Sequence, residues 1–166
     1  TLVWAAGVQA NPVAAALGLE TGRGGRIVVG DDLQVPGRHG VFAIGDVAAI
    51  PDRQWFRTQT PGGNLPQLAP VAMQSGRHAA RQIKRLVAGR STQTFRYLDK
   101  GTMATVGRRA AVAELPGRIR LHGSPAWVAW LGLHLLTLVG FRNRVSVFVN
   151  WAWSYLTWDR GPRLIF

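Results

Sequence analysis

The chain has 166 residues, of which 47% are hydrophobic, so it can form one domain or two small ones and is not a disordered tail. It contains no cysteine, which excludes disulfides, thiolate metal sites, iron–sulfur clusters and cysteine redox chemistry, so any redox activity requires a bound organic cofactor. The net charge of +12 comes almost entirely from arginine, which indicates either the composition of a GC-rich genome or an anionic partner such as a membrane surface. Nucleic acid is not expected, because the sequence lacks a zinc finger, an aromatic RNA-binding signature and a dense basic helix.

The N-terminal part of the chain has the pattern of short buried strands joined by turns. Residues 1–7 form an apolar run that ends at a glycine, and the chain opens in this run without an initiator methionine, so we expect a fragment of a longer protein. A brief helical turn is expected over residues 12–19, beginning at Asn-Pro. Residues 26–29 are largely β-branched, residues 41–44 are apolar, and both segments are flanked by glycine, so we predict a strand in each.

A helix is predicted in the middle of the chain. It follows a loop over residues 51–64, which contains two prolines, one glycine pair and no periodic pattern. From residue 66 to residue 87, small and apolar residues recur on one face while basic residues lie off it, and Gly89 ends the pattern. Strand-like patterning then follows in three segments, residues 94–97, 103–106 and 110–115. We place a domain boundary near residue 93, which divides the chain into residues 1–93 and 94–166.

Two apolar helices are expected near the C-terminus, at residues 125–141 and 145–158. The first would be about 25 Å long, shorter than the roughly 30 Å hydrocarbon core of a bilayer. The second has one narrow polar stripe, formed by Ser146, Asn150, Ser154 and Thr157. Because tryptophan and arginine suit the headgroup region, we predict that residues 125–158 lie in the interface of an anionic membrane. The alternatives are a hairpin buried in a core or dimer contact, and a transmembrane helix over 125–141.

The dipeptide Gly45–Asp46 stands at the carboxyl end of the predicted strand 41–44, which is where ligands bind in open α/β sheets. The glycine would let a ligand approach the backbone closely, and the carboxylate could accept a hydrogen bond from a sugar-alcohol hydroxyl. The N-terminus of the predicted helix 66–87 favours negative charge, such as the N1–C2=O edge of a reduced flavin. The residues alone leave open a plain turn and an ordinary surface helix.

Six segments occur in an order that resembles the C-terminal half of type II NADH dehydrogenases. They are LVWAAGV, GGRIVV, VFAIGD, LAPVAMQSGRHAA, YLDKGTMATVGRRAAVAE and GFRNRVSVFVNWAWSY. The resemblance covers nearly the whole chain, and the last two segments are the most specific. It implies an α/β fold, in which the C-terminal part of an FAD-binding two-dinucleotide-fold flavoprotein precedes a small β region and amphipathic, membrane-associating helices.

The activity implied by the resemblance is electron transfer from NADH through FAD to a membrane quinone, without proton pumping. It also implies peripheral association with the cytoplasmic face of the cell membrane, and it is compatible with a homodimer. The NADH site and the glycine loop for the FAD phosphates have no counterpart in the sequence. We therefore expect the 166 residues alone to be inactive and assign them no catalytic residue.

Residue by residue, the resemblance assigns six positions to the cofactor. Gly45–Asp46 would hold the ribityl chain of FAD, and Ala6–Gly7 resembles the strand end where the chain returns from the NADH domain to the FAD domain. Ala69 would meet the flavin pyrimidine edge at the start of the helix. Lys100 would lie near the isoalloxazine ring, although without the resemblance it is a solvated turn lysine.

One departure from the family pattern concerns the quinone. Many members have Ala-Gln at the helix start, with the glutamine near the quinone head group, whereas this chain has Ala69–Pro70. Proline cannot supply a side-chain hydrogen bond, so a related branch or a different acceptor stays open. We assign Pro70 and Met73 to the quinone site. Gln74, one turn along, is interpreted as a helix-surface residue and not as a substitute for the missing glutamine.

This function has three alternatives. Sulfide:quinone reductase shares the architecture but depends on cysteines, which are absent here. Another FAD/NAD(P)H-dependent oxidoreductase of the superfamily would use a different acceptor. A non-enzymatic, basic membrane-surface module would bind liposomes without flavin. His134 is interpreted as a packed, hydrogen-bonded core histidine and not as a proton donor to reduced quinone, and no residues have metal-ligand spacing.

Overall fold

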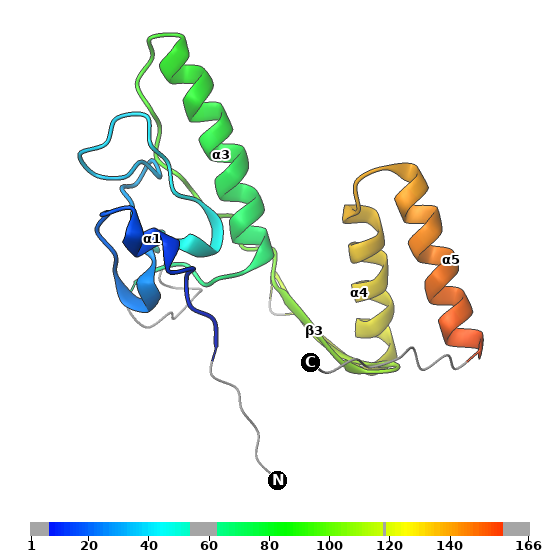
Figure 1. The fold of residues 1–166 in the computed structure, drawn as a ribbon. Helices are drawn as coiled ribbons and strands as arrows, with labels where there is room; N and C mark the ends of the chain where they lie inside the picture. The colour runs from blue at the N-terminus through cyan, green and yellow to red at the C-terminus, as the bar shows by residue number, and fades with distance from the viewer. Residues whose placement is uncertain (1–6, 54–62, 118, 158–166) are drawn as a thin grey trace. The chain divides into compact units, whose positions relative to one another are not determined.

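A computed structural model describes residues 7–53, 63–117 and 119–157 (Figure 1). It consists of two compact units, Thr1–Asp99 and Lys100–Phe166. The division follows residue 99, whereas the change in sequence pattern places a boundary near residue 93. The strand predicted over residues 1–7 lies almost wholly outside the described residues.

The first unit contains a small parallel sheet of two strands, β1 (Ile27–Val28) and β2 (Ala48–Ala49). The helical turn α1 (Val13–Ala16) and the 3-10 turn η1 (Arg23–Gly25) precede β1, and the 3-10 turn η2 (Gly45–Val47) leads directly into β2. The structure confirms the predicted helical turn and a shortened form of the strand predicted at 26–29. The β2 strand was not predicted.

The strand predicted at residues 41–44 is wrong. Only Phe42 pairs there, in an isolated bridge to Gln34. The chain turns on both sides of this bridge, because Gly40 and Gly45 have φ angles of 78° and 64°. Because these two glycines have left-handed backbone conformations, the extended strand cannot continue past them. The apolar residues 41–44 therefore pack without forming a strand.

The long helix α3 (Ala69–Val87) confirms the helix predicted from residue 66, with a start three residues later. Leu68 is its extended N-cap, and Pro70 lies in the first turn, where the missing N–H removes no intrahelical bond. Lys84 and Arg85 lie in the last turn, where positive charge complements the helix dipole. The buried face is partly polar and consists of Val71, Ser75, His78, Ala79 and Gln82.

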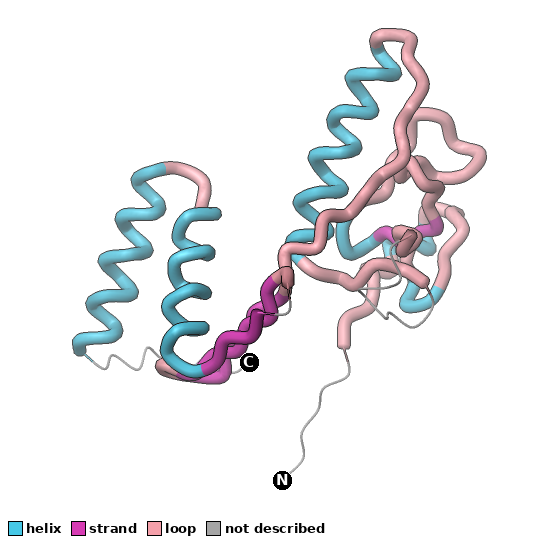
Figure 2. The backbone as a smooth tube through the Cα atoms, turned by 180° about the vertical axis from the view of Figure 1, so that it is seen from behind, coloured by secondary structure: helices cyan, strands magenta, loops and turns pink. Residues whose placement is uncertain are grey.

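The strand predicted at residues 94–97 is also wrong. Phe95 and Tyr97 are buried while their neighbours are exposed, which produces the alternation of a strand. No ladder forms there, and the segment instead runs irregularly back along α3 after the helix ends (Figure 2). The alternation therefore reflects burial of an extended segment against the core. That core of the first unit is formed by Ala14, Ile27, Val29, Leu33, Val35, Ala43, Ala48, Ile50, Leu65, Val71, Phe95 and Tyr97.

The second unit begins with an antiparallel sheet in the order β3 (Thr102–Gly107), β4 (Ala110–Leu115) and β5 (Ile119–His122). The first two strands confirm the predictions at 103–106 and 110–115, whereas β5 was not predicted. Two helices follow, α4 (Gly123–Thr137) and α5 (Phe141–Thr157). They confirm the two predicted helices, each beginning a few residues earlier than expected. A small core is formed by Ala111, Ala113 and Ala126.

Aromatic side chains join α4 to α5. The rings of Trp130 and Trp151 are 6.2 Å apart, and those of Trp127 and Tyr155 are 5.6 Å apart. Arg108, in the β3–β4 turn, places its guanidinium 4.6 Å from the Tyr155 ring centroid. It also donates to the Ser154 carbonyl at 2.7 Å, near the C-terminal end of α5. These contacts hold the helix pair on the sheet.

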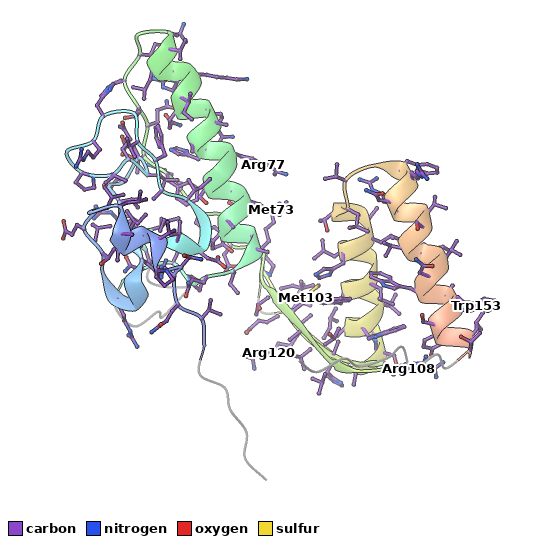
Figure 3. All side chains as sticks on the ribbon, viewed as in Figure 1. Met73, Arg77, Met103, Arg108, Arg120 and Trp153 are labelled. Carbon is purple, nitrogen blue, oxygen red and sulfur yellow. The ribbon has the colours of Figure 1, made fainter. Side chains whose placement is uncertain are left out.

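The outer surface of this helix pair is largely apolar. Exposed apolar side chains extend over both helices and their connection: Val128, Leu133, Leu136, Val139, Phe141, Val145, Phe148, Val149, Trp153 and Leu156. Trp153 projects away from the helix pair (Figure 3). The prediction of a core histidine at position 134 is wrong, because His134 is exposed; its ring stacks on Trp130 and its Nδ1 lies 2.8 Å from the Trp130 carbonyl oxygen.

Within residues 7–53, 63–117 and 119–157, no helix is both long enough and apolar enough to cross a bilayer.

Candidate functional site

The Gly45–Asp46 turn lies against the second turn of α3. Gly45 has a φ of 64°, which favours glycine, and a Cβ at this position would lie 3.3 Å from the Ala72 Cβ. The next part of α3 also lies close to the residue before Gly45, since a Cβ at Gly76 would lie 3.6 Å from Ile44 Cδ1. The two glycines and Ala72 therefore allow the turn to approach the helix closely.

Hydrogen bonds fix the turn in this position. The Gly45 amide donates to Ser75 Oγ at 3.1 Å, and the Ser75 hydroxyl donates to the Ala72 carbonyl at 3.0 Å. Ser75 is fully buried, so an unpaired amide here would be costly. On the other side, Gln67 Nε2 donates to the Asp46 carbonyl at 3.0 Å. The backbone of the turn is thus held both by α3 and by the segment that precedes it.

The side chain of Arg26 also supports the backbone near the Gly45–Asp46 turn. Its guanidinium donates to the Ala48 carbonyl at 2.9 Å through Nε and to the Leu65 carbonyl at 3.0 Å through Nη2. Burial lowers the pKa of Arg26 below its ordinary value, and the nearby charge of Asp46 opposes this shift. Arg26 therefore connects the chain after Asp46 to the chain before α3, and places a positive charge near the carboxylate.

The Asp46 carboxylate is exposed, and within the described part of the chain it accepts no hydrogen bond. The first turn of α3 carries no side-chain cap, and Ala69 is exposed there. The amides of Ala69 and Val71 have no intrahelical acceptor, and Pro70 has no N–H. An acceptor for hydroxyl groups thus adjoins a helix end that favours carbonyl or negatively charged groups. A flavin with its ribityl chain has both kinds of group, so the residues present fit it.

The other predicted site residues lie in different places. Ala6 lies outside the described residues, and Gly7 is exposed with a φ of 80°. Met73 is 47% exposed and projects from the same side of α3 as Arg77 (Figure 3). Lys100 is exposed and belongs to the second unit. The structure therefore brings together the turn at Gly45–Asp46 and the helix that starts at Ala69, and it leaves the other assignments as predictions.

Sequence reasoning missed the residues that support the turn. Ser75 is a single small polar residue within the helix, so its hydroxyl gave no separate signal. Arg26 looked like an ordinary charged residue at the edge of a strand. Gln67 precedes the helix in a segment without periodicity. Only the fold shows that these three side chains hydrogen-bond to the backbone around the Gly45–Asp46 turn.

A buried polar network lies farther along α3. His78 is 5% exposed, and its Nε2 lies 2.9 Å from the Gln93 carbonyl oxygen, which can only accept. The Gln93 amide donates to Gln82 Oε1 at 2.9 Å. Burial lowers the pKa of His78, reinforced by Arg81 and opposed by the bond to Gln93 and the charge of Asp32. The network joins the helix to the segment that follows it.

A cavity of about 360 Å³ also occurs in the first unit. Its lining residues are Asp31, Pro51, Asp52, Arg53, Leu65, Thr94, Phe95, Arg96 and Tyr97. None of them is a predicted site residue. We therefore base the site on the Gly45–α3 contact, where an exposed carboxylate and a helix N-terminus adjoin, and not on the volume of this cavity.

Two family models match the chain. The model of the pyridine nucleotide-disulphide oxidoreductases matches residues 1–76, and the model of the NDH2 C-terminal domain matches residues 100–158. The first match contains the Gly45–Asp46 turn and the start of α3, and the second contains the three-stranded sheet and both C-terminal helices. The two matches thus fall on the two structural units.

Curated relatives agree with these matches. The chain is 38% identical to the type II NADH:quinone oxidoreductase NdhA of Mycobacterium tuberculosis, over 98% of this chain and 34% of that protein. It is 36% identical to a type II NADH:quinone oxidoreductase of Staphylococcus haemolyticus, over 71% of this chain and 28% of that protein. It is 30% identical to the mitochondrial internal alternative NAD(P)H-ubiquinone oxidoreductase A1 of Arabidopsis thaliana, over 93% of this chain and 32% of that protein.

The fold is a mixed α/β arrangement with a parallel and an antiparallel sheet, as in a pyridine-nucleotide-dependent flavoprotein. The chain belongs to the type II NADH:quinone oxidoreductase family. It spans about a third of the length of the curated relatives that it matches.

Proposed function

We propose that the complete protein carrying this chain is an FAD-dependent NADH:quinone oxidoreductase that does not pump protons. The observation that carries the proposal is the packing of the Gly45–Asp46 turn against the N-terminal part of α3. This packing joins the two elements that a flavin would need, in a chain whose relatives are named for NADH and quinone. The cofactor, the electron donor and the acceptor are all part of the proposal.

Each residue of the site has a proposed role toward FAD. Asp46 accepts hydrogen bonds from the ribityl hydroxyls. Gly45 has no Cβ and therefore lets the ribityl group pass close to the protein backbone. The amide end of α3 at Ala69 stabilises negative charge at the pyrimidine edge, and Lys100 adds a positive charge near the ring system. When bound, FAD supplies the chemistry of accepting a hydride and releasing two electrons. Ala6 and Gly7 stand where the chain would return from the NADH domain to the FAD domain.

The proposed quinone site differs from the family pattern at one residue. Pro70 stands where a hydrogen-bonding glutamine is expected, and it is half-buried in the first turn of α3. Pro70 and the exposed Met73 then offer an apolar surface to the acceptor, without a side-chain donor. This favours a hydrophobic quinone, and it keeps a different acceptor as the second candidate.

We further propose that α4 and α5 rest on the cytoplasmic face of the cell membrane. Their outer surface exposes large apolar side chains, including Val139 at 85% and Phe141 at 81%. Arg142 follows directly and is exposed, so positive charge adjoins apolar surface as an anionic interface requires. A second copy of the chain is the alternative cover for this surface.

The flavin and the activity are tested together on the complete protein. We expect it to purify yellow and to reduce a short-chain quinone with NADH. A yellow protein that oxidises NADH with ferricyanide but not with any quinone would favour the second candidate, a different acceptor. A folded but colourless protein that binds liposomes would contradict the enzyme and favour a non-enzymatic membrane-surface module.

A further inference from the structure

The side chain of Gln67 connects the two parts of the candidate cofactor site. Gln67 stands shortly before Ala69, the first residue of α3, and its Nε2 donates to the Asp46 carbonyl at 3.0 Å. All of these groups belong to the first unit. Gln67 therefore links the turn that carries the Asp46 carboxylate to the segment that enters the helix.

The bond to Asp46 determines how the amide group of Gln67 is oriented. A backbone carbonyl can only accept a hydrogen bond, so Nε2 has to face Asp46, and Oε1 is the atom that is left over. Among the residues that the structure describes, none donates a hydrogen bond to this oxygen. Gln67 thus has one anchored end and one unused acceptor, and both lie beside the start of α3.

The pyrimidine ring of a flavin needs an acceptor of this kind. It has an N–H group, N3–H, between the carbonyl groups C2=O and C4=O. A protein that binds this edge has to supply donors for the carbonyl oxygens and an acceptor for the N–H. In the proposed site, the amides at the start of α3 can only donate, and Asp46 is assigned to the ribityl hydroxyls. The N3–H group therefore requires a further acceptor.

We propose that Gln67 Oε1 accepts a hydrogen bond from the flavin N3–H, which makes Gln67 a further cofactor-binding residue. The inference rests on the proposed function, in which the pyrimidine edge lies at the start of α3. Because Nε2 is anchored on Asp46, the acceptor is oriented before the flavin binds, and less side-chain freedom is lost on binding. Gln67 thus selects flavins that carry a hydrogen at N3 over flavins that carry a substituent there.

The first test compares FAD with N3-methyl-FAD, in which a methyl group replaces the hydrogen at N3. Each flavin is added to the apoprotein of the complete enzyme, and the Kd is measured by quenching of flavin fluorescence. The methyl group removes the donor and occupies the space next to Oε1, so wild-type protein should bind N3-methyl-FAD about tenfold or more weakly than FAD. Equal affinity for the two flavins would overturn the proposal, because N3 would then donate to no protein group.

The second test assigns this preference to Gln67. Gln67→Ala removes the acceptor and leaves room for the methyl group, so the preference for FAD should fall to about threefold or less. Gln9→Ala removes an exposed glutamine that belongs neither to the turn nor to α3, and it should keep the wild-type preference. If Gln67→Ala keeps the full preference, another group accepts from N3–H and the proposal is wrong.

A third variant, Gln67→Glu, separates the acceptor from the attachment to Asp46. Its carboxylate keeps an acceptor for N3–H but has no donor for the Asp46 carbonyl. We expect this variant to keep the preference for FAD over N3-methyl-FAD, although its affinity for both flavins falls. A loss of preference equal to that of Gln67→Ala would show that Gln67 acts only by holding the turn, and it would overturn the proposed contact.

A failure of this inference is distinguishable from a failure of the proposed function. A complete protein that binds neither flavin and does not oxidise NADH would overturn both. A complete protein that is yellow and reduces quinone with NADH, yet binds FAD and N3-methyl-FAD equally well, would overturn only the role of Gln67.

Discussion

The amide of Gly45 donates a hydrogen bond to the buried hydroxyl of Ser75, 3.1 Å away, and so fastens the Gly45–Asp46 turn to α3. The turn carries the exposed Asp46 carboxylate, and the helix carries the amides at its N-terminus, so this bond helps to fix the distance between the two groups. Any ligand that spans both groups needs them at a constant separation. The Gly45–Ser75 bond and the close approach to Ala72 supply that constancy without using Asp46 itself.

Replacing Gly45 by alanine should destabilise the protein through two separate effects. The φ of 64° costs a non-glycine residue about 1–2 kcal/mol, and the new Cβ would press on Ala72 at 3.3 Å. Gly37→Ala is the matched control, because Gly37 has a φ of 72° and open space around a Cβ. Thermal unfolding should therefore show a larger loss for Gly45→Ala, accompanied by reduced flavin content. Equal losses in both variants would mean that the contact with α3 is loose.

Arg26→Met should weaken the frame around the turn. The substitution leaves the Ala48 and Leu65 carbonyls without their partner, which costs about 1–3 kcal/mol of unfolding free energy. Arg23→Met, at an exposed position, should change the unfolding free energy by less than about 0.5 kcal/mol. Denaturant titration of the two variants gives the comparison, and a similar midpoint for both would argue against a structural role for Arg26.

Acidification should destabilise the protein through His78. Folding lowers the pKa of this histidine below its ordinary 6.5, so the unfolded chain binds more protons than the folded one once the pH falls below that value. The stabilisation is fully present above pH 6.5 and is lost as the pH drops, by at most about 1.4 kcal/mol per pH unit. His78→Phe should flatten this part of the curve, while the exposed His39→Phe should not. A curve of unchanged slope in His78→Phe would contradict the assignment.

The apolar surface of α4 and α5 should bind vesicles. Trp153 is 65% exposed and projects outward, so Trp153→Ser in the complete protein should weaken binding to anionic vesicles about tenfold, equivalent to roughly 1.4 kcal/mol of lost burial. Ser146→Ala, on the polar stripe, should stay within twofold. Co-sedimentation with vesicles of phosphatidylglycerol and phosphatidylcholine measures both. Undiminished vesicle binding together with dissociation of a dimer in Trp153→Ser would assign the surface to a second copy.

The periodic spacing of apolar residues predicted the regular helices and strands correctly. It failed where a similar spacing occurs in a segment without regular secondary structure. The period of α3 and the alternation of β4 gave both elements correctly within a few residues. The alternation at Phe95 and Tyr97 looked the same, yet it comes from an irregular segment held by side chains of α3. The sequence shows the alternation of apolar and polar residues, but it does not show whether the apolar ones are buried by a neighbouring strand or by a helix and the core.

The candidate site was likewise predicted only in part. Asp46 was predicted from the rule that ligands bind at strand ends, although the strand at 41–44 does not form and a 3-10 turn presents the carboxylate. The prediction was useful because a glycine followed by a carboxylate favours a turn in either case. The role of Ser75 could not be predicted, since its partner is a backbone amide 30 residues away in the chain.

The flavin content of Asp46→Ala in the complete protein tests the proposed cofactor site most directly. Removing the exposed carboxylate should abolish most of the visible flavin absorbance while the thermal unfolding of the apoprotein stays close to that of wild-type apoprotein. Glu20→Ala, which removes another exposed carboxylate, should retain full absorbance. If Asp46→Ala and Glu20→Ala bind flavin equally well, no flavin is held at the Gly45–Asp46 turn.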